Sequence, residues 1–328
     1  MDIRSVVDNL RKKGQLEEIS TPVSRHLAAA GRIAAASPRP VYFHDLDGYR
    51  VAANLVTGRQ AIADALGLPM EGFLAALNER LRDGGVIEQV KEPPCQELVI
   101  DPPDLTRLPI LLHYPGDGGP YLTSGVWVVE DPVNGRNLSY HRMMLLDDRT
   151  GVARVVEGRG MARALSRGGP GTPVAVCIGV PYNVLIAAAL SPAEDLDECI
   201  LAARLGPLQL APCRTIELEV PAATEIVLEM RYTGKTAPEG PFLDITKTTD
   251  IEREQPVFEV SAITMRRDPI YHALLPAGIE HCSLMGLPKE LDIYAAVSRT
   301  CEARDVVITP GGCSWLHAVI AIAVRDRK

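Results

Sequence analysis

The chain has 328 residues and a formal net charge of −8, and its length favours two domains, because single cores rarely exceed about 250–300 residues. With 46% hydrophobic and 23% charged residues, it has the composition of a globular protein and not of a disordered one. The acidic balance, the lack of a basic stripe and an aromatic content of 5% argue against a nucleic-acid partner.

Targeting and redox signals favour an aqueous, reducing compartment. The N-terminus lacks the apolar run of a signal peptide, and the longest apolar runs fall well short of the roughly 20 residues of a membrane span. The seven cysteines are scattered without the paired spacing of a disulfide framework. We therefore expect a soluble, cytoplasmic protein with free thiols and no membrane partner.

The first hundred residues are predicted to alternate helices and strands. Apolar residues recur at helical spacing from Ile3 to Leu10, and short apolar runs flanked by turn residues are typical of strands. The predicted elements are helices 3–13, 59–66 and 70–81 and strands 40–43 and 49–53. We predict an N-terminal α/β domain over residues 1–100.

The character of the chain changes after Pro93-Pro94. Residues 101–109 are too rich in proline for a helix, and Asn134-Gly135 between two apolar runs predicts a β-hairpin. The predicted strands are 122–130, 138–147, 153–156, 174–180, 214–220, 225–232 and 257–265, and the predicted helices are 161–166, 184–190, 196–205 and 289–303. This pattern favours a mostly antiparallel barrel with inserted helices over residues 101–303, followed by terminal strands within 304–328.

Two acids bracket a turn in residues 239–244, which read EGPFLD. Gly240-Pro241 excludes a helix, so both carboxylates sit on a loop or at a strand entry, where scaffolds commonly present catalytic groups. Neighbouring carboxylates resist simultaneous ionisation, so one can keep a proton near neutral pH and act as a general acid. The alternative is a surface turn with two solvated acids.

A second polar segment, residues 137–142, reads NLSYHR and falls on a predicted strand. The period of two places 137, 139 and 141 on one face and the residues between them on the other. Its arginine could hold a substrate carboxylate through two hydrogen bonds. The alternative is that His141 and Arg142 are ordinary partners on a half-exposed sheet.

An acidic cluster occupies residues 194–198 at a predicted helix start. The helix dipole favours acids in the first turn and explains most of them. Glu198 lies further into the helix beside apolar residues, which suggests a ligand for a hard metal ion.

Taken in order, these segments resemble the UbiD family of reversible decarboxylases that use prenylated FMN. The likeness runs over most of the chain and rests on the succession of motifs, not on any one of them. The matching segments are 108–109, 117–123, 131–135, 137–142, 197–198, 225–229, 239–244 and 275–281. The resemblance implies an α+β fold, in which the N-terminal α/β domain is followed by a split β-barrel flavin-binding domain with inserted helices.

The resemblance also implies a reaction, reversible non-oxidative decarboxylation of an aromatic or α,β-unsaturated carboxylic acid, with prenylated FMN, Mn²⁺ (or Mg²⁺) and K⁺ as cofactors. Arg142, Glu239 and Asp244 match the family's catalytic trio. Asn137 and Glu198 match ligands of the divalent metal that bridges to the cofactor phosphate. The flavin-lining segments match Ser139, Tyr140, His141, Arg142, Ser191 and Pro192.

The chain departs from the family pattern at the metal. The family has a metal-binding histidine shortly after the arginine, whereas residues 154–160 read RVVEGRG. Glu157 could replace it as an oxygen ligand, since Mn²⁺ and Mg²⁺ accept carboxylates. Alternatively, Arg159 could neutralise the cofactor phosphate directly, without a metal.

Length is a further departure. Members of the family usually continue into a C-terminal domain that mediates dimerisation and closes over the cofactor, and we expect this domain to be absent here. We therefore expect a homo-oligomer or a partner subunit, with a flavin prenyltransferase as the source of the cofactor. The alternatives are a non-catalytic or accessory subunit that needs a partner chain, and a flavin-reductase-like oxidoreductase that would not need the trio.

Overall fold

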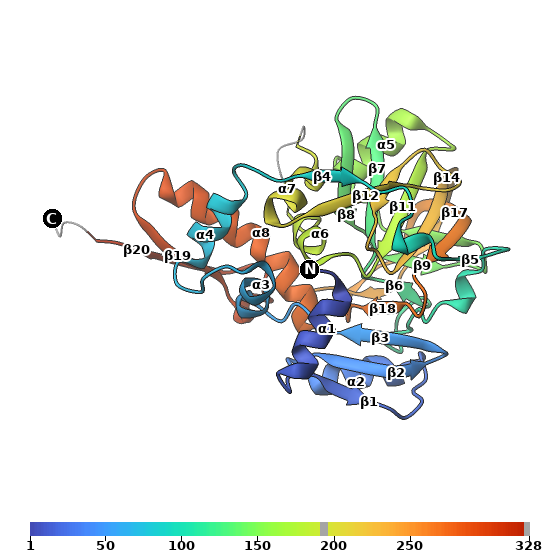
Figure 1. The fold of residues 1–328 in the computed structure, drawn as a ribbon, viewed down its shortest axis with the longest axis horizontal. Helices are drawn as coiled ribbons and strands as arrows, with labels where there is room; N and C mark the ends of the chain where they lie inside the picture. Colours follow the sequence, from blue (N-terminus) through green and yellow to red (C-terminus); the bar gives the residue numbers. More distant parts are fainter. Residues whose placement is uncertain (191–195, 325–328) are drawn as a thin grey trace.

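The structure of the protein is a computed structural model that describes residues 1–190 and 196–324, so the predictions at Ser191 and Pro192 lie outside the described residues. Figure 1 shows a small sheet with its helices beside a larger sheet, and a long helix, α8, that leads to a projecting hairpin. This arrangement confirms the predicted α+β class. No helix of the described segments has the length and apolarity to cross a membrane.

The N-terminal sheet contains one strand from far along the chain. Its order is β1-β2-β3-β18, with β18 (Ile270–Ala273) parallel to β3. The other elements of this region are α1 (Ile3–Lys12), β1 (Glu17–Ile19), α2 (Ala28–Ala36), β2 (Val41–Leu46), β3 (Tyr49–Ala53), α3 (Arg59–Leu66) and α4 (Phe73–Arg80). The division at residue 100 stays a prediction, and β18 ties the two predicted domains together.

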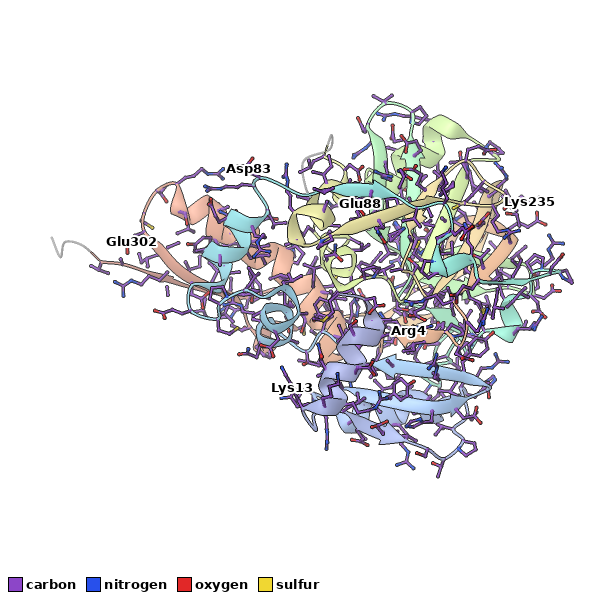
Figure 2. All side chains as sticks on the ribbon, in the orientation of Figure 1. Arg4, Lys13, Asp83, Glu88, Lys235 and Glu302 are labelled. Carbon is purple, nitrogen blue, oxygen red and sulfur yellow. The ribbon has the colours of Figure 1, made fainter. Side chains whose placement is uncertain are left out.

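A buried ion pair joins α1 to the large sheet. The Arg4 guanidinium donates to both carboxylate oxygens of Glu225 at 2.8 Å, and the Glu225 side chain is fully buried. Figure 2 shows Arg4 where α1 meets the large sheet. This pair fixes the N-terminal helix against the second domain.

The large sheet is antiparallel and, within the described residues, nine-stranded, with the order β6-β9-β10-β17-β14-β11-β7-β8 and β5 paired to β17. Its strands are β5 (Leu98–Ile100), β6 (Tyr121–Leu122), β7 (Val126–Asp131), β8 (Gly135–Tyr140), β9 (Met143–Leu145), β10 (Thr150–Ala153), β11 (Pro173–Ile178), β14 (Ile226–Glu239) and β17 (Arg253–Met265). The predicted hairpin at Asn134-Gly135 is confirmed between β7 and β8.

Both faces of this sheet are buried. Val126 and Val128 of β7 belong to one core cluster, and Trp127 and Val129 belong to the other, as the period of two along a strand requires. The remaining elements are β4 (Ile87–Gln89), η1 (Pro94–Gln96), η2 (Leu105–Arg107), α5 (Gly160–Gly168), α6 (Tyr182–Ala187), α7 (Glu198–Leu205), β12 (Leu208–Pro212), β13 (Glu219–Pro221), β15 (Phe242–Leu243), β16 (Thr249–Asp250), α8 (Ile279–Ser298), β19 (Ala303–Ile308), η3 (Pro310–Gly312) and β20 (Ala318–Ile322).

Several of the predicted elements are wrong in extent. The strand predicted at 138–147 is split between β8 and β9, and the strand predicted at 153–156 overlaps β10 only at Ala153. The helix predicted at 289–303 begins ten residues earlier, at Ile279, and continues through Pro288, while Ala303 already belongs to β19. The strand predicted at 214–220 is reduced to β13 (Glu219–Pro221). The backbone N–H groups of Arg214 and Thr215 donate instead to the buried carboxylate of Glu229, at 2.8 and 2.6 Å.

Helix α8 is held to the N-terminal domain by a buried carboxylate in its first turn. Glu280 Oε1 accepts hydrogen bonds from the backbone N–H groups of Leu55 at 3.2 Å and Val56 at 3.0 Å, and lies 3.0 Å from His272 Nε2. The Glu280 and His272 side chains are each only 1% exposed. The start of α8 is therefore fixed by polar contacts that water cannot replace.

Glu280→Ala should lower the free energy of unfolding by at least about 2 kcal/mol, because it leaves several buried donors without an acceptor. The measurement is urea unfolding followed by fluorescence. Glu79→Ala is the control, since Glu79 makes only an exposed pair with Arg82, of a kind worth about 0–1 kcal/mol. Equal midpoints for the two variants would contradict the anchoring role.

Candidate active site

A cavity of about 730 Å³ lies where several elements of the second domain converge. Its walls come from β8 and the loop after it, the start of α5, the start of α7, the hairpin β15–β16 and one face of α8. Of the predicted site residues within the described segments, the cavity is lined by Asn137, Ser139, Tyr140, His141, Arg142, Arg159, Glu198 and Asp244. Residues far apart in the sequence thus share one cavity, as the motifs predicted.

Strand β8 presents its polar residues as predicted. Ser139 Oγ lies 3.0 Å from His141 Nε2, and His141 Nδ1 lies 3.0 Å from the carbonyl oxygen of Arg154. Burial lowers the pKa of His141 to about 4, so the ring is neutral at pH 7. It therefore donates from Nδ1 to the carbonyl and accepts at Nε2 from Ser139, which fixes its orientation.

The strongest interaction in the site joins Arg142 to Glu239. Arg142 Nε donates to Glu239 Oε1 at 2.8 Å, and Nη2 donates to Oε2 at 3.0 Å. The Glu239 side chain is fully buried, that of Arg142 is 12% exposed, and Tyr121 adds a hydrogen bond of 3.0 Å to Oε1. Strand β8 ends at Tyr140, so Arg142 is free of the strand's alternation and can reach this cavity.

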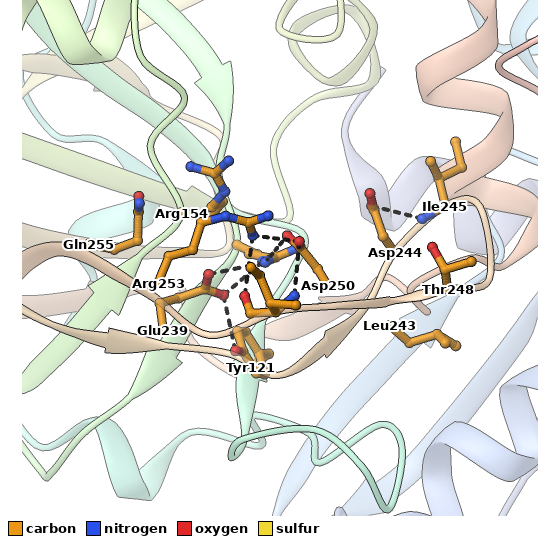
Figure 3. A network of polar contacts seen from close by, with 12 residues as sticks. Tyr121, Arg154, Glu239, Leu243, Asp244, Ile245, Thr248, Asp250, Arg253 and Gln255 are labelled. Atoms are coloured by element: carbon orange, nitrogen blue, oxygen red, sulfur yellow. Dashed lines mark hydrogen bonds and ion pairs between the residues drawn. The ribbon is translucent and has the colours of Figure 1, made fainter.

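The second acid that contacts Arg142 is Asp250, which sequence reasoning missed. Arg142 Nη2 donates to Asp250 Oδ2 at 2.9 Å, and Arg253 Nη1 donates to Asp250 Oδ1 (Figure 3). Asp250 stands opposite Phe242 in the hairpin β15–β16, and the Arg142 guanidinium lies 4.2 Å from the centre of the Phe242 ring. Burial raises the pKa of Asp250, but the hydrogen bonds from Arg253 and Arg142 outweigh it and the net shift is downward.

Asp244 lies apart from this cluster. The Asp244 carboxylate accepts a hydrogen bond of 2.8 Å from the next backbone N–H, that of Ile245, and has no hydrogen bond or ion pair with Arg142 in the part of the chain that the structure describes. Figure 3 shows it on the opposite side of Asp250 from Glu239. Of the three residues that match the family's trio, Arg142 and Glu239 are thus in contact, the second acid on Arg142 is Asp250, and Asp244 lines the same cavity.

The turn at 239–244 packs against the backbone at Gly118. The N–H of Gly118 donates to the carbonyl of Pro241 at 2.8 Å, and Asp117 accepts from the N–H of Leu243 at 3.3 Å. A Cβ at Gly118 would lie 2.1 Å from the carbonyl oxygen of Gly240, closer than any real contact. The glycine at this position is therefore needed for close approach of two backbone segments.

At the other end of the cavity, Asn137 and Glu198 lie together. Asn137 Nδ2 donates to Glu198 Oε1 at 3.1 Å, and the N–H of Leu138 donates to Oε2 at 2.8 Å. Burial raises the pKa of Glu198 to about 7, which its hydrogen bonds only partly offset. Among residues 1–190 and 196–324, Glu198 has no cationic side chain as partner, and a buried carboxylate of this kind is a fitting ligand for a bound cation.

The third predicted metal ligand does not join them. Glu157 is exposed and is not among the residues that line the cavity, and no group of three His, Cys, Asp or Glu side chains suited to a metal occurs within residues 1–190 and 196–324. Arg159, at the N-cap of α5, does line the cavity, together with Arg154. The end of the cavity near Asn137 can therefore hold an anion through Arg159, and a cation through the oxygens of Asn137 and Glu198.

Helix α8 supplies a wall that the motifs did not predict. His281 lines the cavity and accepts at Nδ1 a hydrogen bond of 3.1 Å from the N–H of Ala277. Burial lowers the pKa of His281 to about 4, so the neutral ring carries its proton on Nε2. The helical spacing of His281, Met285 and Lys289 could have indicated this face had the helix been predicted to cross Pro288.

Two family models match consecutive parts of the chain. The Rift-related domain of 3-octaprenyl-4-hydroxybenzoate carboxy-lyase, UbiD, matches residues 88–279, and the N-terminal domain of the same family matches residues 7–81. The chain belongs to the UbiD family, a family of carboxy-lyases.

Curated relatives and solved structures agree with this family. The chain is 38% identical to the anhydromevalonate phosphate decarboxylase of Methanosarcina mazei, over 98% of the chain and 76% of the relative. It is 44% identical to the protein of that name in Methanothermobacter thermautotrophicus, over 67% of the chain and 53% of the relative. The chain thus spans only about half to three quarters of these relatives.

Among solved structures, an evolved dimeric form of the UbiD-class enzyme HmfF from Pelotomaculum thermopropionicum, in complex with prFMN, matches with a TM-score of 0.95 and 31% identity, over 99% of this chain and 79% of that one. The vanillic acid decarboxylase of Sedimentibacter hydroxybenzoicus in open form matches with a TM-score of 0.87 and 25% identity, over 99% and 74%.

Gly118→Ala should lower the stability by about 1–3 kcal/mol, because its Cβ must push the turn at Gly240 away. Thermal unfolding measures the cost, and a crystal structure measures the shift of Glu239. Gly116→Ala is the matched control, since a Cβ there meets nothing within 4 Å. If the two variants unfold at the same temperature, the close approach at Gly118 is not a constraint.

Proposed function

We propose that the chain is a prenylated-FMN-dependent decarboxylase of an α,β-unsaturated acid, and that its substrate is anhydromevalonate phosphate or a close analogue. The observation that carries the proposal is Arg142, which lines a cavity large enough for a flavin and is held there by the buried carboxylate of Glu239. A buried pair of this kind is costly to desolvate and is weak evidence for stability alone, so a role in binding an anion accounts for it better.

The substrate class follows from the relatives. Five curated relatives, with identities of 32% to 44%, are named anhydromevalonate phosphate decarboxylase. Loss of water from mevalonate phosphate, a 3-hydroxy acid, gives an unsaturated acid that still carries its phosphate ester. The sequence analysis predicts an aromatic or an α,β-unsaturated acid as substrate, and the names of the relatives favour the α,β-unsaturated acid.

The residues present fit a flavin phosphate at the Asn137 end of the cavity. Arg159 lines the cavity next to Gly160, where an added Cβ would lie 2.8 Å from Asn137, and α5 begins there without a side-chain cap on its backbone N–H groups. Prenylated FMN, when bound, would supply an electron sink for the electron pair that stays on the substrate carbon when CO2 leaves. The neighbouring structures that contain prFMN and FMN support this cofactor.

The chain's own residues bind, orient and deliver a proton. Arg142 holds the substrate carboxylate by charge-assisted hydrogen bonds, and Glu239 with Tyr121 keeps the guanidinium in place. Asp244, half-buried on the cavity wall and outside the ion-pair cluster, donates the proton to the carbon that has lost CO2. The apolar wall of Leu274, Leu284 and Phe242 keeps water from the reacting carbon.

Asn137 and Glu198 would hold Mn²⁺ or Mg²⁺ next to the flavin phosphate, with Arg159 as a further cation at that phosphate. Two protein oxygens suit Mg²⁺ and Mn²⁺, which keep water and phosphate oxygens as their other ligands. The K⁺ site that the family resemblance implies stays a prediction.

The proposal includes an oligomer or a partner subunit. One similar structure is a dimeric form of a UbiD-class enzyme, and another, the vanillic acid decarboxylase ShVdcCD, is named together with a separate component, ShVdcD. Cofactor supply by a flavin prenyltransferase stays a prediction. The alternative of an accessory subunit is less favoured, because such a subunit has no need to keep a buried arginine between two acids.

The test is expression with a flavin prenyltransferase, followed by assay of CO2 release from anhydromevalonate phosphate and from cinnamate. Wild-type protein should act on the first and not on the second. Asp244→Asn should lose about 10²-fold or more in kcat, as expected for a general acid, while still binding the substrate. If the protein carries flavin but releases no CO2 from either acid, the proposed function is wrong and the chain is an accessory subunit.

Glu198→Gln should retain less flavin and less manganese than wild-type protein after gel filtration, because it removes the charge of the metal ligand. Absorption spectra and elemental analysis measure both. Glu157→Gln is the matched control and should leave both contents unchanged, since Glu157 is exposed outside the cavity. If Glu157→Gln lost flavin and manganese while Glu198→Gln kept both, Glu157 and not Glu198 would be the metal ligand.

A further inference from the structure

The hydrogen-bond donors of Arg142 are nearly all engaged within the protein. A guanidinium has five N–H groups. Nε gives its one to Glu239, and Nη2 gives one to Glu239 and one to Asp250. No hydrogen bond from Nη1 is found in the described part of the chain, so its two N–H groups are the ones left for a ligand in the cavity.

Asp250 is itself held in place from two directions. Its Oδ1 accepts from Arg253 Nη1, and its backbone pairs with Phe242 across the short hairpin. The Phe242 ring lies under the Arg142 guanidinium, at 4.2 Å. The Arg142 guanidinium is therefore held by three side chains, those of Asp250, Glu239 and Phe242.

We propose that Asp250 is a positioning residue of this site, which locks the Arg142 guanidinium so that its Nη1 edge alone faces the cavity and receives the substrate carboxylate. Without Asp250, the Nη2 group would have a free N–H, and the guanidinium could offer a carboxylate either of two edges. When only one edge is available, every substrate carboxylate binds in the same orientation. The carboxylate ligand in this inference rests on the proposed function. The orientation of the Arg142 guanidinium without ligand does not.

Charge neutralisation is a second part of this role. Arg142 and Arg253 both donate to Asp250, so its carboxylate separates two guanidinium groups. Asparagine at this position can offer one oxygen to one arginine, but its NH₂ group would then oppose the donors of the other. Glutamate keeps the charge and both oxygens at the end of a longer arm.

The test compares Asp250→Ala, Asp250→Asn and Asp250→Glu, each loaded with prenylated FMN and normalised to bound flavin, with anhydromevalonate phosphate as substrate. In Asp250→Asn, kcat should fall about tenfold to 10²-fold, the range expected when a binding group is misplaced by about 1 Å. KM should change far less than kcat, because Arg142 can still attract a carboxylate. Asp250→Glu should recover more of kcat than Asp250→Asn does.

Glu254→Gln is the matched control, since it removes an exposed acid from the same strand, β17, that carries Arg253. It should leave kcat and KM unchanged. Wild-type kcat and KM in Asp250→Asn would overturn the proposal. If Asp250→Ala does not fold, the nearly isosteric Asp250→Asn decides alone.

Crystal structures of wild-type protein and Asp250→Asn without substrate separate this inference from the proposed function. The wild-type structure should show Nη1 facing the cavity, and the variant should show the guanidinium rotated or in two positions. A wild-type protein that releases no CO2 from anhydromevalonate phosphate would reject the substrate, yet the rotation would still support Asp250. An unmoved guanidinium in the variant would reject Asp250, whatever the activity.

Discussion

The site depends on one buried ion pair, Arg142 with Glu239. Its carboxylate is fully buried, and desolvation of two charges is repaid only when hydrogen bonds satisfy both groups. The surrounding residues meet this condition: Tyr121 donates to the carboxylate, Phe242 covers the guanidinium, and Asp250 takes a further N–H. The pair joins the loop after β8 to the end of β14, so it also fixes the hairpin that carries the other acids.

Local patterns predicted much of the fold, because they depend on neighbours in sequence. The continuous apolar runs of β7 and β11 and the helical periodicity near residues 3–12, 59–66 and 160–168 are local hydrophobic patterns, and they predict these elements. The first half of α8 could not be predicted this way, since Pro288 argues against a helix there and packing overrides that preference. Residues 214–218 were mistaken for a strand because the buried Glu229 that binds their backbone is distant in sequence.

The same distinction explains what could be predicted of the site. The motifs identified Asn137, Arg142 and Glu198, which line one cavity, and Glu239, which binds Arg142 from behind that wall, because motif residues are identified by type and order. They could not choose between Asp244 and Asp250, since that choice depends on the register of a hairpin of two residues per strand. They also could not exclude Glu157, because its type suits a metal and only its exposure removes it.

The position of α8 links the stability of the fold to the shape of the site. Glu280 binds the backbone after β3, and Glu290 pairs with Arg59 at 3.0 Å, so the N-terminal domain holds this helix at two levels. Between those anchors, the face with His281 and Met285 lines the same cavity as Arg142. No residue of the first hundred lines the cavity, but residues 55, 56 and 59 hold the helix that forms one of its walls. A change at Glu280 or Arg59 therefore acts on the cavity through the helix, and the site is a property of both domains together.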